Sequence, residues 1–245
     1  MMYLVATAER RSADQLPSEP ARLRRDFRRF NLPVQLALAA ATDVVPAAED
    51  SGRMAVISLS PCQNGSPELY HWAEAAIAAG SGGGHFGAAR MNPTHTLHVI
   101  DNLALSAFAI AYRSDGYCLG VGGAPGQAWC GMEILLERLA DGREREGLLM
   151  AGDQARITDG TGGRGVALLF SVQRRPYAAL GRPVELISIE HKRRPTPLPV
   201  AAHAAAGLCD LIAALAGHGA GDVAYEVPAE HTDGIDDVTV ILRVA

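Results

Sequence analysis

The chain has 245 residues, of which 48% are hydrophobic and 20% are charged, and its formal net charge is −5. This length supports one sizeable hydrophobic core or at most two small domains. The net negative charge disfavours non-specific nucleic-acid binding. The sequence contains no uninterrupted run of 18 apolar residues, so no membrane span is predicted.

Apolar patterns and turn residues predict an alternation of strands and helices, after which strands cluster. The predicted strands are 3–6, 54–61, 96–100, 117–121, 147–152, 165–172, 184–191 and 236–245. The predicted helices are 22–45 with a new start near Pro33, 66–80, 101–113, 125–140 and 199–217. This order predicts an α/β fold with a mixed sheet. We expect one domain over 1–245, with a main body over 1–175 and a smaller C-terminal part over 176–245.

The helix predicted over 101–113 is apolar on nearly every side. Asp101 or Asn102 is expected to begin it, and Gly116 is expected to end it. A helix of this composition buries all its sides, either in a core or against a partner.

A strand, a glycine turn and a helix meet between residues 117 and 140. The strand leads into Gly122 and Gly123, and Pro125 starts the helix. Many α/β enzymes carry a nucleophile at such a turn, but proline has no nucleophilic group. The stretch "GVGGAP" departs from the dinucleotide pattern G-x-G-x-x-G at its sixth position, and no P-loop or G-x-S-x-G motif occurs. Cys130, one turn into the helix, is expected to be buried and unreactive.

Metal and disulfide sites are not expected. The cysteines are far apart and form no C-x-x-C pair: Cys62, Cys118, Cys130 and Cys209. Near His85, the pair His95 and His98 would point to opposite sides of a strand. No metal or cofactor is therefore predicted. A reducing cytoplasm is the expected compartment, and "MMYLVATAERR" has too short an apolar run for a signal peptide.

Two basic segments allow two interpretations. Residues 22–29, "RLRRDFRR", contain five arginines, and residues 191–195 read "HKRRP". Each is either a solvated face or a docking patch for an acidic partner, such as an acyl carrier protein.

The segments together resemble the β-ketoacyl synthases of the thiolase-like fold, in particular their short N-terminal-like group. In that family a strand and Asp-Thr-Ala-Cys lead into a helix, and "VGGAP" places Pro125 where the family has its acyl-accepting cysteine. The stretch "RMNPTHTLHVIDNLALSAFAIAYRSDG" is similar to the segment that leads into the family's interface helix, with matches at Pro93, Asn102 and Ala104. "AAHAAAGLCDLIAAL" is similar to the family's GHxxxAAG stretch, with His203 in the place of the histidine.

The resemblance covers most of residues 3–175 and, more weakly, 196–245. It implies a thiolase-like fold with flanking helices and a truncated second half. It also implies that the chain does not catalyse condensation, because Pro125 cannot be acylated and at best one family histidine, His203, is present.

The function implied by the resemblance is that of a chain-length factor. Such a subunit forms a heterodimer with an active ketosynthase and shapes the acyl tunnel, in type II polyketide, aryl polyene or fatty-acid-like biosynthesis. An acyl carrier protein would contact mainly the partner. The residues expected at the tunnel or interface are Leu105, Phe108, Tyr112, Asn102, Gly122, Gly123 and Gln127. Two alternatives remain open: an acyltransferase or decarboxylase that uses Cys130 or His203, and a homodimeric acyl-binding module.

Overall fold

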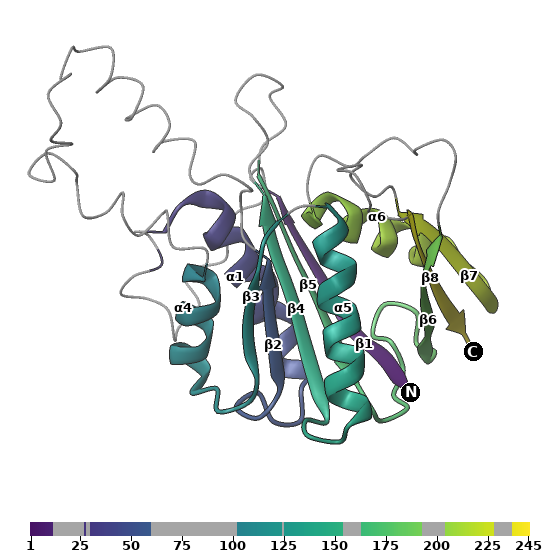
Figure 1. Cartoon of the computed structure of the whole chain (residues 1–245), viewed down its shortest axis with the longest axis horizontal. Coiled ribbons are helices and arrows are strands. Elements are labelled where there is room, and N and C mark those ends of the chain that lie inside the picture. The colour runs from purple at the N-terminus through teal and green to yellow at the C-terminus, as the bar shows by residue number, and fades with distance from the viewer. Residues whose placement is uncertain are drawn as a thin grey trace, which may run out of the picture.

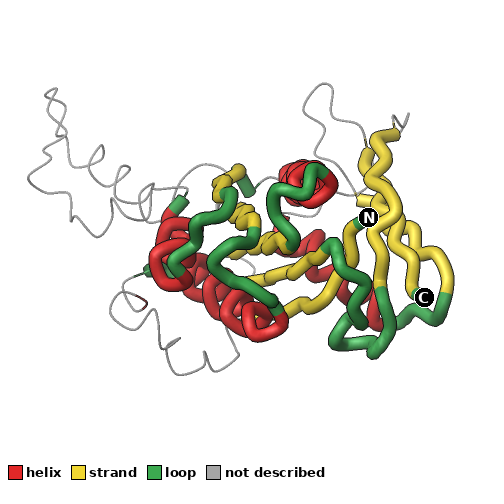
Figure 2. The backbone as a smooth tube through the Cα atoms, turned by 90° about the horizontal axis from the view of Figure 1, so that it is seen from below, coloured by secondary structure: helices red, strands yellow, loops and turns green. Residues whose placement is uncertain are grey.

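A computed structural model describes residues 1–11, 27, 30–59, 102–123, 125–153, 163–192, 204–227 and 237–245. Eight strands form one sheet in the order β3-β2-β4-β5-β1-β6-β8-β7 (Figures 1 and 2). The strands are β1 (Met2–Arg11), β2 (Ala55–Leu59), β3 (Cys118–Val121), β4 (Glu146–Asp153), β5 (Arg164–Ser171), β6 (Val184–Lys192), β7 (Gly221–Val227) and β8 (Asp237–Val244). Strand β2 runs parallel to β3 and β4, and the other neighbours are antiparallel, so the sheet is mixed as predicted.

Helices cover both faces of the sheet (Figure 1). They are α1 (Leu32–Val44), the 3-10 helix η2 (Val45–Ala47), α4 (Leu103–Tyr112), α5 (Pro125–Ala140) and α6 (Ala204–Ala216). Helices α1 and α4 share one buried cluster, which includes Leu38 and Phe108. Helices α5 and α6 share the other cluster, which includes Trp129 and Leu208. The two cores therefore lie on opposite faces of the sheet.

Strand β1 joins two groups of strands. It pairs with β5 along most of its length, and Met2, Tyr3 and Leu4 also pair with the start of β6. The C-terminal strands β6, β8 and β7 thereby continue the sheet that β2 to β5 begin. The first five residues of β1 are all buried.

Most predicted elements in the described part of the chain are present. Helix α1 begins where Pro33 suggested, because the side chain of Asn31 accepts the Val34 N–H at 3.3 Å and caps the helix. The expected strand at 3–6 is longer and extends over Met2–Arg11. Strand β7 was not predicted. The predicted helix at 66–80 and strand at 96–100 lie outside the described residues.

Helix α1 packs unusually close to the sheet at two paired glycines. Gly152 of β4 and Gly165 of β5 are opposite each other in the register. A Cβ atom on Gly152 would lie 2.1 Å from the Pro33 carbonyl oxygen, and one on Gly165 would lie 2.2 Å from the Leu36 carbonyl. These contacts are with helix backbone, so only glycine allows the observed approach.

None of the helices in the described part of the chain has the length and apolar character needed to cross a bilayer.

Candidate functional site at the start of helix α5

The predicted strand, turn and helix are present around Gly122. Strand β3 ends at Val121, and Pro125 is the first residue of the 16-residue helix α5. Because β2, β3 and β4 are parallel, their carboxyl ends lie at the same edge of the sheet, beside this turn. Proline suits the first helical position, since its missing N–H has no intrahelical acceptor there.

Two contacts shape the turn. The amide of Gln127 lies against Gly122, where a Cβ atom would be 2.4 Å from the Gln127 Oε1 atom. Gly123 is buried, and its carbonyl accepts the N–H of Ala204 at 3.1 Å. The start of α6 therefore meets the start of α5 at the turn. Neither Gly122 nor Gly123 carries a side chain that could act as a nucleophile.

The position of His203 is outside the described residues. Its neighbour in sequence, Ala204, is the residue that bonds to Gly123. A role for His203 beside the turn stays a prediction.

Three predicted tunnel residues of α4 lie in the core. Leu105, Phe108 and Tyr112 are 7%, 0% and 8% exposed. The rings of Phe108 and Tyr112 stack with centroids 4.5 Å apart, and the Tyr112 hydroxyl donates to Thr42 Oγ1 at 3.3 Å. A tunnel role for the three residues stays a prediction. The large apolar side chain of α4 that reaches the surface is Ile110, which the sequence analysis did not select.

Asn102 holds the start of α4 against the outermost strand. Its side chain makes no cap hydrogen bond to the helix. Instead, its amide occupies the space above Gly120 of β3, where a Cβ atom would be 1.5 Å from the Asn102 Oδ1 atom. The contact couples α4 to β3.

We expect Gly120→Ala to displace the Asn102 amide and to lower the free energy of unfolding by about 1 kcal/mol. Asn102→Ala removes the clash, so the double variant should recover part of the loss, with a coupling of at least about 0.5 kcal/mol. Urea unfolding of the wild type, both single variants and the double variant measures this coupling. Additive losses would show that the two residues do not interact.

Cys130 lies exposed on α5, so the expectation that it is buried was wrong. The pKa of its thiol is nevertheless raised, first by partial desolvation from the surrounding protein and then by the negative charges of Glu133 and Glu137. A raised pKa leaves less thiolate at neutral pH, and the thiolate is the nucleophilic form. The raised pKa therefore supports the expectation that Cys130 is a poor nucleophile, although the side chain is exposed.

Iodoacetamide should alkylate Cys130 more slowly at pH 7 than it alkylates the cysteine of a short unstructured peptide, because less thiolate is present. Mass spectrometry of the intact chain and its peptides measures both rates. Glu133→Gln with Glu137→Gln removes two negative charges and should speed the reaction. Alkylation of wild-type Cys130 faster than the peptide at pH 7 would contradict the prediction.

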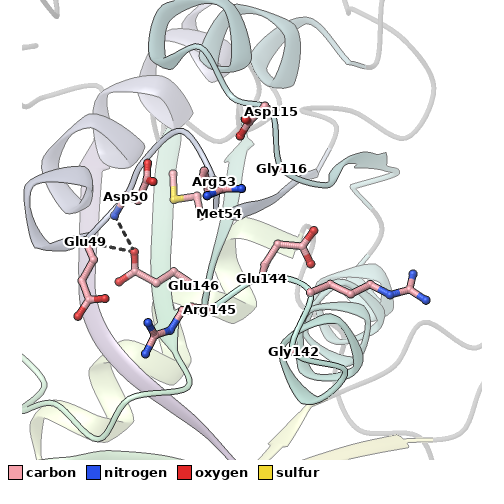
Figure 3. A pocket seen from close by; sticks show the side chains of 11 residues that line it. Glu49, Asp50, Arg53, Met54, Asp115, Gly116, Gly142, Glu144, Arg145 and Glu146 are labelled. Atoms are coloured by element: carbon pink, nitrogen blue, oxygen red, sulfur yellow. Dashed lines mark hydrogen bonds between the residues drawn. The ribbon is translucent and has the colours of Figure 1, made fainter.

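A polar cavity of about 510 Å³ lies among the loops that lead into β2, β3 and β4 (Figure 3). Its lining residues are Glu49, Asp50, Arg53, Met54, Asp115, Gly116, Gly142, Arg143, Glu144, Arg145 and Glu146. Only Gly116 among them was singled out from the sequence, as the expected end of a helix, whereas α4 ends earlier, at Tyr112. The cavity is at the amino ends of the parallel strands, whereas the turn at Gly122 is at their carboxyl ends.

Two buried glutamates fix the walls of this cavity. Glu144 is bound by Arg138 at 3.0 and 2.6 Å and accepts the Tyr117 N–H at 3.3 Å. Glu146 is bound by Arg175 and accepts the N–H groups of Glu49 at 2.8 Å and Asp50 at 3.3 Å (Figure 3). Both carboxylates are thus committed to holding loops together, which indicates a structural role.

Some predicted features lie outside the described residues. They are Cys62, His85, His95, His98, Asp101, the arginines of 22–29 and the "RRP" of 193–195. Within the described ranges, no group of three His, Cys, Asp or Glu side chains is placed to hold a metal ion.

The chain is similar to known proteins in its fold, whereas the sequence comparisons found no match. No family model and no curated protein matches the chain. A ketosynthase in complex with its chain length factor, from Xenorhabdus doucetiae, superposes with a TM-score of 0.55 at 12% identity and covers 83% of this chain. A β-ketoacyl synthase from Burkholderia phymatum has a TM-score of 0.49 at 12% identity and covers 82% of this chain.

The chain spans 65% of the length of each of these two chains. The superposition on a chain of the Xenorhabdus structure is a likeness of fold. The described part of the chain has the thiolase-like fold of the ketosynthases.

Proposed function

We propose that this chain is a non-catalytic ketosynthase-like subunit that pairs with an active ketosynthase as its chain-length factor. The observation that carries the proposal is Pro125 at the start of α5 in a ketosynthase fold. Condensation needs a nucleophile that holds the acyl chain as a thioester. By the resemblance, that nucleophile would stand at the position of Pro125, and proline cannot be acylated.

Two further observations support this proposal. The Xenorhabdus structure with the same fold is itself a ketosynthase in complex with its chain length factor. The raised pKa of Cys130 disfavours this thiol as a replacement nucleophile. We place the subunit in type II polyketide, aryl polyene or fatty-acid-like biosynthesis, where it shapes the tunnel for the growing chain. The acyl carrier protein delivers substrate mainly to the partner.

Co-expression with an active ketosynthase from the same organism, followed by native mass spectrometry, tests the proposal. We expect a 1:1 heterodimer. After incubation with radiolabelled acyl carrier protein, the label should appear on the partner and not on this chain. A partner with its nucleophilic cysteine changed to alanine is the control, and should take no label.

Three results would contradict the proposal. Acyl label on this chain would show that it is an acyltransferase, and Cys130→Ala would locate the nucleophile. Turnover of a carrier-bound malonyl group by the chain alone would show a decarboxylase. A stable homodimer that ignores the ketosynthase and binds acyl groups would show a binding module.

A further inference from the structure

A side-chain bond joins helix α5 to the far end of strand β6. The Nε2 atom of His191 lies 2.6 Å from the Oε1 atom of Glu133, although the two residues are 58 positions apart in the sequence. The side chain of His191 is 49% exposed, and that of Glu133 is 34% exposed. Because both groups reach the solvent, His191 can take up or release a proton while the chain stays folded.

The start of β6 is held in a different way. Strand β1 pairs with β6 at three positions, from Val184 to Leu186. In the described part of the chain, the rest of β6 pairs with β8 alone, and β8 belongs to the same C-terminal group of strands. The far half of β6 rests on the core through Ile189 and reaches α5 through His191. The two ends of β6 are therefore attached by unlike interactions, a backbone ladder and a polar side-chain bond.

The groups of α5 near this bond are acidic. Glu137 lies one turn after Glu133 on the same face, and the thiol of Cys130 lies one turn before it. The bond to His191 is made by Glu133. A positive charge on His191 would thus meet one bonded carboxylate and a second carboxylate one turn away, which both favour that charge.

The other elements add few charges beside His191. Glu190 and Lys192 hold the neighbouring positions of β6, which belong to the opposite face of the sheet. On β8 the residue opposite His191 is the apolar Val238. Helix α6 carries one charged residue, Asp210, whose charge acts on Tyr225 of β7.

Protonation changes the strength of the bond. A neutral imidazole and a carboxylate share an ordinary hydrogen bond, whereas an imidazolium makes a charge-assisted bond that is roughly twice as strong. An ordinary histidine titrates at about pH 6.5. The added strength is therefore fully present below that pH, and it is lost as the pH rises through the range in which His191 gives up its proton.

We propose that the bond between His191 and Glu133 is a pH-sensitive latch. It holds the far end of β6 on α5 in mildly acidic solution and loosens at alkaline pH, whether or not the chain pairs with a ketosynthase. The latch lies close to the candidate site in the order of the elements. Glu133 follows Pro125 by about two helical turns, and α6, the next helix after β6, begins at the residue that bonds to Gly123.

Hydrogen exchange of the backbone amides of β6 tests the latch at about pH 5.5 and about pH 8, on either side of the histidine range. Each variant is compared with the wild type at the same pH, so that the intrinsic pH dependence of exchange cancels. At the lower pH, Glu133→Gln should speed exchange over 188–191 by at least about threefold, as expected for a partly exposed ion pair. At the higher pH the same substitution should change exchange by less than about 1.5-fold, because His191 is then neutral.

Glu137→Gln is the matched control, because it removes a carboxylate from the same face of α5 and leaves the bond to His191 in place. It should change exchange over 188–191 by less than about 1.5-fold at both pH values. His191→Gln can still form a hydrogen bond but carries no charge, so it should act like Glu133→Gln at the lower pH. The double variant should exchange no faster than either single variant, since the two residues act through one bond.

Three results would each overturn the latch. Equal acceleration by Glu133→Gln at both pH values would show an ordinary hydrogen bond with no pH-dependent part. Wild-type exchange in Glu133→Gln at the lower pH would show that the bond does not hold β6. An effect of Glu137→Gln as large as that of Glu133→Gln would show that the overall charge of α5 acts, and not this bond. Circular dichroism of each variant checks that the fold is retained.

Discussion

Replacing Arg175 by methionine is expected to lower the free energy of unfolding by about 3 kcal/mol, because it removes the cation from a buried ion pair. The Glu146 side chain is 4% exposed and that of Arg175 is 23% exposed. Without Arg175 the Glu146 carboxylate keeps two backbone N–H donors but has no neutralising charge. The loops around the polar cavity should loosen, since Arg175 also donates to the Ala47 carbonyl at 3.0 Å.

Urea denaturation followed by circular dichroism measures this loss. Arg143→Met is the control, because Arg143 and Asp141 form an exposed pair at 3.9 Å, and it should change stability by less than about 0.5 kcal/mol. Adding Glu146→Gln to Arg175→Met removes the unpaired charge and should recover part of the loss. A loss for Arg175→Met as small as that of the control would show that Glu146 does not depend on this partner.

Gly165→Ala is expected to destabilise the protein by about 3 kcal/mol, at the upper end of the usual range for overpacked sites. The added methyl group would lie 2.2 Å from the Leu36 carbonyl and 2.7 Å from the Ala37 N atom. Both are backbone atoms, so no side-chain rotation relieves the overlap, and α1 must move away from β5. That movement would open the core that α1 shares with α4.

Gly217→Ala is the control for this variant, because no atom lies within 4 Å of the position that its Cβ would take. It should shift stability by less than about 0.5 kcal/mol. Gly152→Ala, directly opposite Gly165, should behave like Gly165→Ala when the midpoint and slope of urea unfolding are compared. Wild-type stability in Gly165→Ala would mean that α1 can shift without losing contacts.

The starts of α1 and α5 followed from short-range signals, because caps and breakers act within a few residues. The ends of β1 and α4 did not: β1 runs to Arg11, and α4 ends at Tyr112, before Gly116. Asn31 and Pro33 mark the start of α1, and Pro125 marks the start of α5. Strand β7 was missed although Val223, Tyr225 and Val227 alternate with polar or small residues. Gly221 and Asp222 at its start have low strand propensity, so the segment was not predicted as a strand. Its pairing with β8 outweighs that low propensity.

The face of α4 that is buried could not be read from its sequence. Its residues are almost all apolar, so the packing against α1 and the sheet decides that Phe108 turns inward and Ile110 outward. The burial of Glu144 and Glu146 was also beyond sequence reasoning. In "DGREREG" these two glutamates have the pattern of solvated loop charges. Arg175, which pairs with Glu146, comes from another segment of the chain.

The contact between the start of α6 and the turn was not predicted. The resemblance put His203 in the place of a family histidine, but it gave no contact between Ala204 and Gly123. The contact of Gln127 with Gly122 needs the three-dimensional turn, because it depends on which way the first turn of α5 faces.

The central place of β1 has a consequence for how the chain folds. Thr7 and Tyr177, which are 170 residues apart, share a hydrogen bond of 2.6 Å. At ribosomal speeds of roughly 5–20 residues per second, β1 waits of the order of ten seconds or more for β5 and β6 to be synthesised. During that interval its apolar start, "MYLVA", lacks both of its native strand partners and is open to aggregation. Such non-local pairing also slows folding. Chaperone supply during expression should therefore govern the soluble yield of this chain.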